Sequence, residues 1–184
     1  MPKKIASAEE RVEYALLLTE NHQISEAQRV LRRIRRAKLS NRGLRMAAQA
    51  YFRCNRLEDV ENCMWLLEIY GGIEPGDFFM LGSLQMRRSK YWHAAHHFYR
   101  EIEIAIDTGM TDFKSSAAIR LASIMLEHRR FDEAKTALAI VNDGACEFIE
   151  GVGLTTKEDL LKQLQHARAI GNLCGPVIPW IYRN

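Results

Sequence analysis

Apolar side chains in the middle of the chain recur at the spacing of one face of an α-helix. Leu31 and Ile34 follow Ala27 by four and seven residues, for example. Positions separated in this way lie on one side of a helix, whereas a half-buried strand needs alternating apolar and polar residues. Such alternation is scarce, and Pro75 is the one proline between residues 3 and 175. The pattern predicts an all-α fold without strands.

A pattern with a period of roughly 34 residues, typical of stacked helix pairs, occurs four times along the chain. Each copy has a short polar turn, a hydrophobic or aromatic residue, polar residues, and then an anchor residue that opens a second apolar stripe. The fourth anchor stands further from the third than the first three stand from one another, so we expect an insertion before the fourth copy. The anchors are Ala27, Val60, Ala94 and Ala134.

A small residue stands twelve positions before each anchor. These small residues are Ala15, Ala48, Gly82 and Ala122. A glycine inside a helix costs about 1 kcal/mol relative to alanine, so Gly82 indicates that two helix backbones approach closely there. We expect each small residue to face a partner helix, with Gly82 opposite Ala94.

This arrangement resembles the tetratricopeptide repeat family over residues 8–142, with the best match around Phe79, Gly82 and Phe98. The resemblance implies antiparallel helix pairs that stack into a right-handed superhelix. The expected fold class is an all-α solenoid of about four such helix-turn-helix pairs plus a C-terminal capping helix. The expected domains are a repeat domain at 1–145 and, at 146–184, the capping helix with an apolar tail. Small tetratricopeptide chaperones of type III secretion are a weaker resemblance.

Several residues predict where helices begin. Three pairs have the spacing of a capping box, in which two side chains satisfy exposed backbone amides: Ser7 with Glu10, Ser25 with Gln28, and Thr155 with Glu158. The segment 74–77 combines proline and glycine and predicts a turn before a new helix. Leucines spaced along residues 156–170 predict a final amphipathic helix that covers the last repeat.

No arrangement of residues predicts catalysis, a cofactor or a bound metal. His93, His96 and His97 share one helix face, but no carboxylate or cysteine stands at a spacing suited to a metal site, so we expect packing or solvated histidines. Two glycine-containing segments, 71–72 and 151–153, lack the strand and lysine of a phosphate-binding loop. The four cysteines have no close pairing and predict reduced packing residues. We therefore expect a protein that is not an enzyme.

Positive charge gathers near the N-terminus. Residues 1–45 hold 11 Lys and Arg against 5 Asp and Glu, whereas residues 46–184 hold 15 against 18. A contact with nucleic acid, an acidic protein or anionic lipid is one interpretation. The other, which the sequence favours, is an arginine-covered outer helix face, because no aromatic residues interleave for base stacking. The basic run is Arg29, Arg32, Arg33, Arg35, Arg36 and Lys38.

The tetratricopeptide resemblance implies that the first helix of each pair lines a concave, peptide-binding groove. Arginines alternate there with apolar residues, which suits a partner segment with apolar anchors and nearby carboxylates. We expect about half of the apolar residues to pack between repeats instead. The implied groove residues are Arg45, Gln49, Phe52, Arg53, Phe79, Ser83, Met86, Arg87, Ile119 and Ser123.

The C-terminal tail carries apolar residues that we expect something to cover. Ile178, Trp180 and Tyr182 lie among prolines that favour an extended segment. Such a segment could fill its own groove, dock on a second copy of the chain or join a larger assembly, and the sequence leaves these three alternatives open.

Together these patterns predict an interaction scaffold, namely an adaptor, chaperone or assembly subunit that binds a protein segment. Two alternatives remain: a nucleic-acid-binding or regulatory protein that uses the basic first repeat, and an immunity or inhibitor protein. The N-terminus lacks the apolar stretch of a secretory signal, and no run approaches the roughly 20 apolar residues that span a bilayer. We therefore expect a cytoplasmic protein without a membrane span.

Overall fold

The structure is a computed structural model that describes residues 7–110, 113–149 and 151–171. Within this part of the chain it contains nine α-helices, one short 3-10 turn and a two-stranded sheet, so the protein is mostly helical. Backbone contacts divide the chain into two compact units, Met1–Arg88 and Ser89–Asn184. These are called the N-terminal and C-terminal units below, and the predicted domain division at residue 145 stays a prediction.

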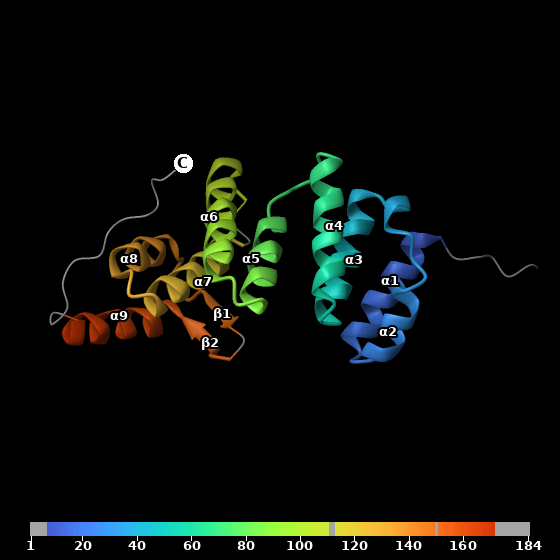
Figure 1. The fold of residues 1–184 in the computed structure, drawn as a ribbon. Helices are drawn as coiled ribbons and strands as arrows, with labels where there is room; N and C mark the ends of the chain where they lie inside the picture. The colour runs from blue at the N-terminus through green and yellow to red at the C-terminus, as the bar shows by residue number, and fades with distance from the viewer. Residues whose placement is uncertain (1–6, 111–112, 150, 172–184) are drawn as a thin grey trace, which may run out of the picture. The chain divides into compact units, whose positions relative to one another are not determined.

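The N-terminal unit consists of helices that pack in consecutive pairs (Figure 1). Helix α1 packs on α2 and on α3, α3 packs on α4, and α4 contacts α5. A 3-10 turn at Arg36–Lys38 leads from the first pair to the second. The helices are α1 (Ala8–Glu20), α2 (Ile24–Leu31), α3 (Asn41–Arg53), α4 (Leu57–Ile69) and α5 (Asp77–Arg87).

One apolar core lies among these helices. Val12 of α1, Leu31 of α2, Leu44 of α3 and Leu67 of α4 are all 0% exposed. Removing a side chain of this size from water contributes roughly 1.5–3 kcal/mol. The Tyr51 hydroxyl enters the same core and donates a hydrogen bond to the Leu31 carbonyl at 3.3 Å, which satisfies its polar atom.

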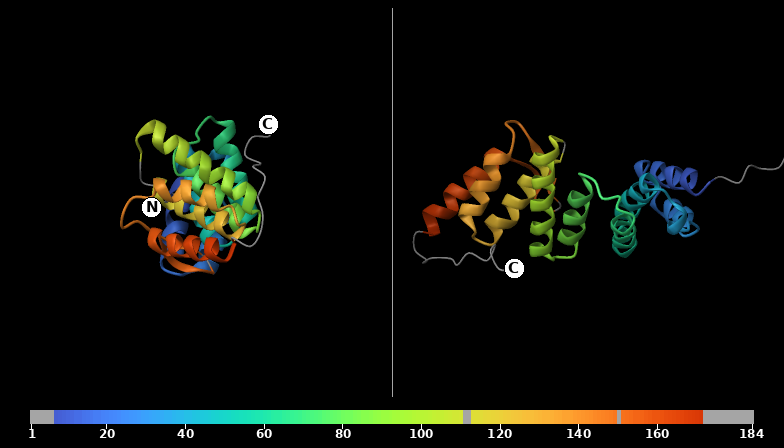
Figure 2. Two further views of the ribbon diagram at one scale, coloured as in Figure 1. Left: turned by 90° about the vertical axis from the view of Figure 1, so that its left-hand side faces the viewer. Right: turned by 90° about the horizontal axis from the view of Figure 1, so that it is seen from above.

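The C-terminal unit is also built around consecutive helices (Figure 2). Helix α6 packs on α7, α7 packs on α8, and α9 contacts both α7 and α8. The predicted final helix is therefore confirmed, and it covers the last helix pair as expected. The elements are α6 (Tyr91–Thr108), α7 (Lys114–Glu127), α8 (Phe131–Ile140), β1 (Cys146–Ile149), β2 (Gly153–Thr156) and α9 (Lys157–Gly171).

The prediction of a chain without strands is wrong for residues 146–149 and 153–156. Strands β1 and β2 form an antiparallel hairpin in which Phe148 lies opposite Leu154. Gly151 and Gly153 have φ values of +84° and +103°, a region that glycine enters without steric cost. The glycines thus make the turn of a hairpin, and the strands are too short for their alternation to stand out.

The same turn joins the two helices of each predicted pair. His22, Asn55, Ser89 and Arg129 have φ values between 55° and 60°, although none is a glycine. Each stands at the same separation before an anchor residue, so the turns recur with the predicted period. In three of these turns the next amide donates to a carbonyl five residues back, a bond typical of a helix C-terminus: Gln23 to Leu18, Arg56 to Tyr51 and Arg130 to Met125.

The anchor and small residues of the repeat are buried. Ala27, Val60, Ala94, Ala134, Ala15, Ala48 and Ala122 are all 0% exposed, and Gly82 is buried as well. The insertion expected before the fourth copy falls on α6, whose 18 residues exceed the 8 of α2 and the 13 of α4. The third predicted pair has α5 in one unit and α6 in the other, so the expected approach of Gly82 to Ala94 stays a prediction.

One of the three predicted capping boxes is confirmed. The Ser7 hydroxyl accepts from the Glu10 amide at 3.1 Å, and the Glu10 carboxylate accepts from the Ser7 amide. The box at Ser25 and Gln28 is wrong, because α2 begins at Ile24 without a side-chain cap. The side-chain amide of Gln28 instead donates to the Cys54 carbonyl, which connects the first helix pair to the second.

The third capping box is displaced by one residue. Thr156 caps α9: its hydroxyl accepts from the Asp159 amide at 3.2 Å, while Asp159 accepts from the Thr156 amide and hydroxyl. Thr155 is instead a buried residue of β2. The shift arises because the strand continues through Thr156 directly into the helix.

Candidate functional site

The predicted groove residues are distributed over both units. Eight of the ten lie in the N-terminal unit, on α3 or α5, and the remaining two lie on α7 of the C-terminal unit. The eight are Arg45, Gln49, Phe52, Arg53, Phe79, Ser83, Met86 and Arg87. Those eight residues can form one site, because α3 and α5 belong to the same compact unit.

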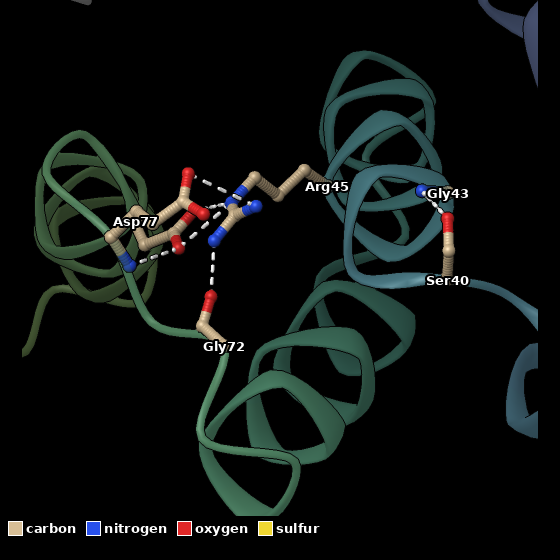
Figure 3. A network of polar contacts seen from close by, with 6 residues as sticks. Ser40, Gly43, Arg45, Gly72 and Asp77 are labelled. Atoms are coloured by element: carbon tan, nitrogen blue, oxygen red, sulfur yellow. Dashed lines mark hydrogen bonds and ion pairs between the residues drawn. The ribbon is translucent and has the colours of Figure 1, made fainter.

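Arg45 and Asp77 form the polar link between the start of α5 and α3 (Figure 3). The Arg45 Nε lies 3.0 Å from one carboxylate oxygen of Asp77 and 3.1 Å from the other. Arg45 also donates to the Gly72 carbonyl and pairs with Glu74 at 3.2 Å. The Asp77 carboxylate accepts from the Glu74 amide at 2.9 Å as well. One arginine therefore holds the whole 72–77 connection against α3.

The expectation that Arg45 offers an open charge to a partner is wrong. Its side chain is 21% exposed and that of Asp77 only 8%, so both are committed to the interior of the unit. Burial raises the pKa of the Asp77 carboxyl, although the Glu74 amide and Arg45 both favour its ionised form. The sequence does not show this pairing, because the two residues stand 32 positions apart.

Phe52 and Arg87 meet further along the same two helices. The Arg87 guanidinium lies 4.0 Å from the centre of the Phe52 ring and donates to the Phe52 carbonyl at 2.9 Å. A cation over an aromatic face is attracted by the ring electrons. The ring is half-buried and Arg87 is exposed, so both can be reached from solvent.

Arg53 and Gln49 extend this region toward α1. Arg53 pairs with Glu20, at the end of α1, at 3.2 Å, and both side chains are nearly half exposed. Gln49 is exposed and Met86 is half-buried. We define the α3–α5 surface as these partly or fully accessible residues: Gln49, Phe52, Arg53, Met86 and Arg87.

Other predicted groove residues lie elsewhere. Ser83 is 5% exposed, and its hydroxyl donates to the Phe79 carbonyl at 2.9 Å. Ile119 is 0% exposed and packs inside the C-terminal unit, while Ser123 on the same helix is half-buried. Ser83 and Ile119 therefore offer no surface to a partner. The tail residues Ile178, Trp180 and Tyr182 lie outside the described residues.

The three histidines of α6 differ in their surroundings. His93 and His96 are exposed, whereas His97 is half-buried. Burial, together with the neighbouring His96 and His93, lowers the pKa of His97 to about 4. Within residues 7–110, 113–149 and 151–171, no three His, Cys, Asp or Glu side chains are placed to hold a metal ion.

The β-hairpin presents apolar side chains that the sequence analysis did not single out. Phe148, Val152 and Leu154 are between 63% and 68% exposed. Arg120 of α7 fixes the other side of the hairpin, with its Nε 3.0 Å from the Glu147 carboxylate and a further bond to the Phe148 carbonyl. A hairpin motif with glycine in its turn was the sequence feature that could have revealed this surface.

No family model, curated protein or solved structure matches this chain. In the described part of the chain, no helix is both long enough and apolar enough to cross a bilayer.

Proposed function

We propose that the chain is a tetratricopeptide-like solenoid that acts as a protein-binding scaffold, with the α3–α5 surface as its binding site. The observation that carries this proposal is the contact between successive first helices at one repeat spacing. Glu20 of α1 pairs with Arg53 of α3, and Phe52 of α3 contacts Arg87 of α5, at separations of 33 and 35 residues. Contacts at the C-terminal ends of α1, α3 and α5 thus link the first helices of three predicted pairs, an arrangement that a shared inner wall requires.

The chemistry of this surface favours a partner segment with one apolar anchor and one or two carboxylates. Phe52 and Met86 can contact an apolar side chain, while Arg53 and Arg87 can each form paired hydrogen bonds with a carboxylate. The present partner of Arg53 is weakly held, because the half-exposed Arg53–Glu20 pair is worth at most about 1 kcal/mol. A partner carboxylate can therefore replace Glu20 at small cost.

This proposal corresponds to an adaptor, a chaperone or an assembly subunit of a multiprotein complex. Catalysis is not required of any of its residues. Arg45 has a supporting role here, because it keeps α5 against α3 and so holds Met86 and Arg87 beside Phe52 and Arg53.

Site-specific photocrosslinking in the native cell tests the proposal. We expect p-benzoylphenylalanine in place of Gln49 to yield a discrete crosslinked partner, and expect Arg53→Glu in the same chain to reduce its yield at least fivefold. The matched control places the crosslinker at Asn62, an exposed residue of α4 in the same unit. A second control combines the Gln49 crosslinker with Lys135→Glu, an equal charge change on an exposed residue of α8.

The proposal fails if Gln49 and Asn62 give the same crosslinked species. It also fails if Lys135→Glu lowers the yield as much as Arg53→Glu, since the effect would then be one of net charge. Circular dichroism of each purified variant should match the wild type, because all substituted side chains are exposed.

A further inference from the structure

The basic run at residues 29–38 differs from the arginines that follow it in the N-terminal unit. Every arginine from α3 to Arg88 has a polar or carboxylate partner. Arg42 pairs with Glu13, Arg45 with Asp77, Arg53 with Glu20, Arg56 with Asp59 and Arg88 with Glu61, and Arg87 donates to the Phe52 carbonyl. Ion pairing is therefore the usual state of the arginines between residues 42 and 88.

Arg36 is the member of the basic run that follows the same rule. It binds Asp59 and lies 5.7 Å from the centre of the Tyr51 ring. Arg56 holds the other oxygen of Asp59 at 2.5 Å, so this carboxylate already has two cations. Asp59 therefore pairs with Arg36 and Arg56 and holds Arg36 in the fold.

The other five cations of the run are exposed, and in the described residues none forms an ion pair. They are Arg29, Arg32, Arg33, Arg35 and Lys38, called the basic segment below. Glu26 of α2 is exposed and stands three residues before Arg29, a spacing at which side chains of a helix can meet, but the two form no ion pair in the described residues. The segment therefore concentrates its uncompensated charges within a short stretch of sequence.

Stabilisation of the C-terminus of α2 accounts for only some of the cations in the basic segment. Cations near a helix C-terminus interact favourably with its carbonyl groups, which explains Arg29 and Arg32 at the end of α2. The effect falls off beyond the last turn, yet Arg33, Arg35 and Lys38 follow the helix. Self-repulsion among like charges makes such a cluster unfavourable unless an anion neutralises it.

We propose that the basic segment binds the phosphate backbone of a double-stranded nucleic acid. A guanidinium group can donate two parallel hydrogen bonds to the oxygens of one phosphate. Four of the five cations are arginines. Residues 24–40 contain no aromatic side chain on which an unpaired base could stack. The segment can therefore hold backbone phosphates but has no means of holding single-stranded bases.

Two structural features make the segment suited to this contact. The 3-10 turn at Arg36–Lys38 is anchored by the Arg36–Asp59 pair, so its exposed neighbours project from a fixed backbone. Leu39 beside them is only 6% exposed and secures the end of the turn in the core. The proposal concerns a surface separate from the α3–α5 surface and does not depend on it.

Fluorescence anisotropy with labelled 20-base-pair duplexes of DNA and of RNA tests the proposal on the full chain. Counterion release contributes a slope of about 0.9 per phosphate contact to the logarithmic salt dependence of the association constant. Five contacts therefore predict that affinity falls roughly 500-fold between about 50 and 200 mM salt. The two duplexes reveal whether the natural ligand is DNA or RNA.

The decisive variant is Arg33→Gln with Arg35→Gln, since both residues lie outside the helices. Loss of two contacts should reduce the fall in affinity over the same salt range to roughly 40-fold. The matched control, Lys135→Gln with Lys162→Gln, removes two charges from exposed residues of α8 and α9 and should behave as wild type.

Four results would overturn the proposal. These are no duplex binding at the lower salt concentration, an unchanged salt slope in the Arg33 and Arg35 variant, an equal loss in the lysine control, and tighter binding of a single-stranded oligo-dT than of either duplex. Tighter binding of poly-glutamate, or of vesicles made from phosphatidylcholine and phosphatidylserine, would likewise overturn it in favour of an acidic protein or a membrane surface. Matching melting curves for all variants exclude unfolding as the cause.

Discussion

Arg45 on α3 and Asp77 at the first position of α5 form an ion pair 3.0 Å long that connects two helices across 32 residues of sequence. The side chain of Asp77 is almost fully buried, and Arg45 is the cation that compensates its charge. This pair explains why the connection between α4 and α5 closes onto α3. Gly72 belongs to the same contact because its carbonyl accepts a hydrogen bond from Arg45. A Cβ atom at this position would also collide with the Asn41 side chain.

Arg45→Met is expected to lower the free energy of unfolding by about 3 kcal/mol, because Asp77 would be left buried without its cation. Urea unfolding followed by circular dichroism measures this change. Arg53→Met provides the control and should cost less than about 1 kcal/mol, since its pair with Glu20 is half exposed. Equal losses of unfolding free energy in the two variants would show that the Arg45–Asp77 pair stabilises the protein no more than the exposed Arg53–Glu20 pair.

Arg129→Gly is expected to stabilise the protein by about 1 kcal/mol. Arg129 has a left-handed backbone conformation, in which its Cβ atom lies too close to the backbone, and glycine has no Cβ atom. The φ of Arg129 is 58°. Asn55→Gly, at the same position of the second turn, should gain less, because asparagine tolerates this conformation better. Thermal melting of both variants gives the order, and a larger gain at Asn55 would contradict it.

Phe98→Ala is expected to cost about 3–5 kcal/mol, because the ring is 0% exposed and its removal leaves a cavity. Ile106→Ala on the same helix is the control, since Ile106 is 60% exposed and its loss creates no cavity. Chemical denaturation distinguishes the two. An unchanged midpoint for Phe98→Ala would mean that the ring is not part of the core.

Acidification below pH 6.5 should destabilise the protein through His97. Its pKa is lowered from 6.5 to about 4 in the folded chain, so the unfolded chain binds a proton that the folded chain refuses. The resulting stability is complete above the unfolded pKa and is lost as pH falls from 6.5 toward 4. Because the ring is only half-buried, we expect about 1 kcal/mol between pH 7.5 and 5.

Comparison of the wild type with His97→Gln measures this contribution. The difference in unfolding free energy between the two chains should shift in favour of the variant as the pH falls. His166→Gln, an exposed histidine of α9, should keep the pH profile of the wild type. A His97 variant whose profile parallels the wild type at every pH would contradict the argument.

Much of the fold was predictable because it depends on local spacing. The burial of Ala15, Ala27, Ala48 and Ala134 followed from apolar periodicity, and the shared turns followed from short polar segments. The hairpin was missed because each strand has only four residues, too few for alternation to be recognised. The cap of α9 was displaced by one residue because a strand runs directly into that helix.

Less of the candidate site was predictable. Gln49 and Arg53 are accessible as a groove residue should be, but Ile119 is fully buried and Arg45 is committed to Asp77. A helix face in the sequence does not reveal which of its residues meets another helix. That information lies in the residues of the neighbouring helices.

The sequence by itself therefore determined the helices, their period and the turns that pair them, because helix faces and turn conformations depend on neighbouring residues. The tertiary structure alone decided which charges are used inside the fold and which remain at its surface. Arg36 and Arg45 belong to the first group and Arg33 and Arg35 to the second, although all four stand between residues 33 and 45. The physical reason is that an arginine pairs only where folding places a carboxylate within reach, as Asp59 and Asp77 are placed here.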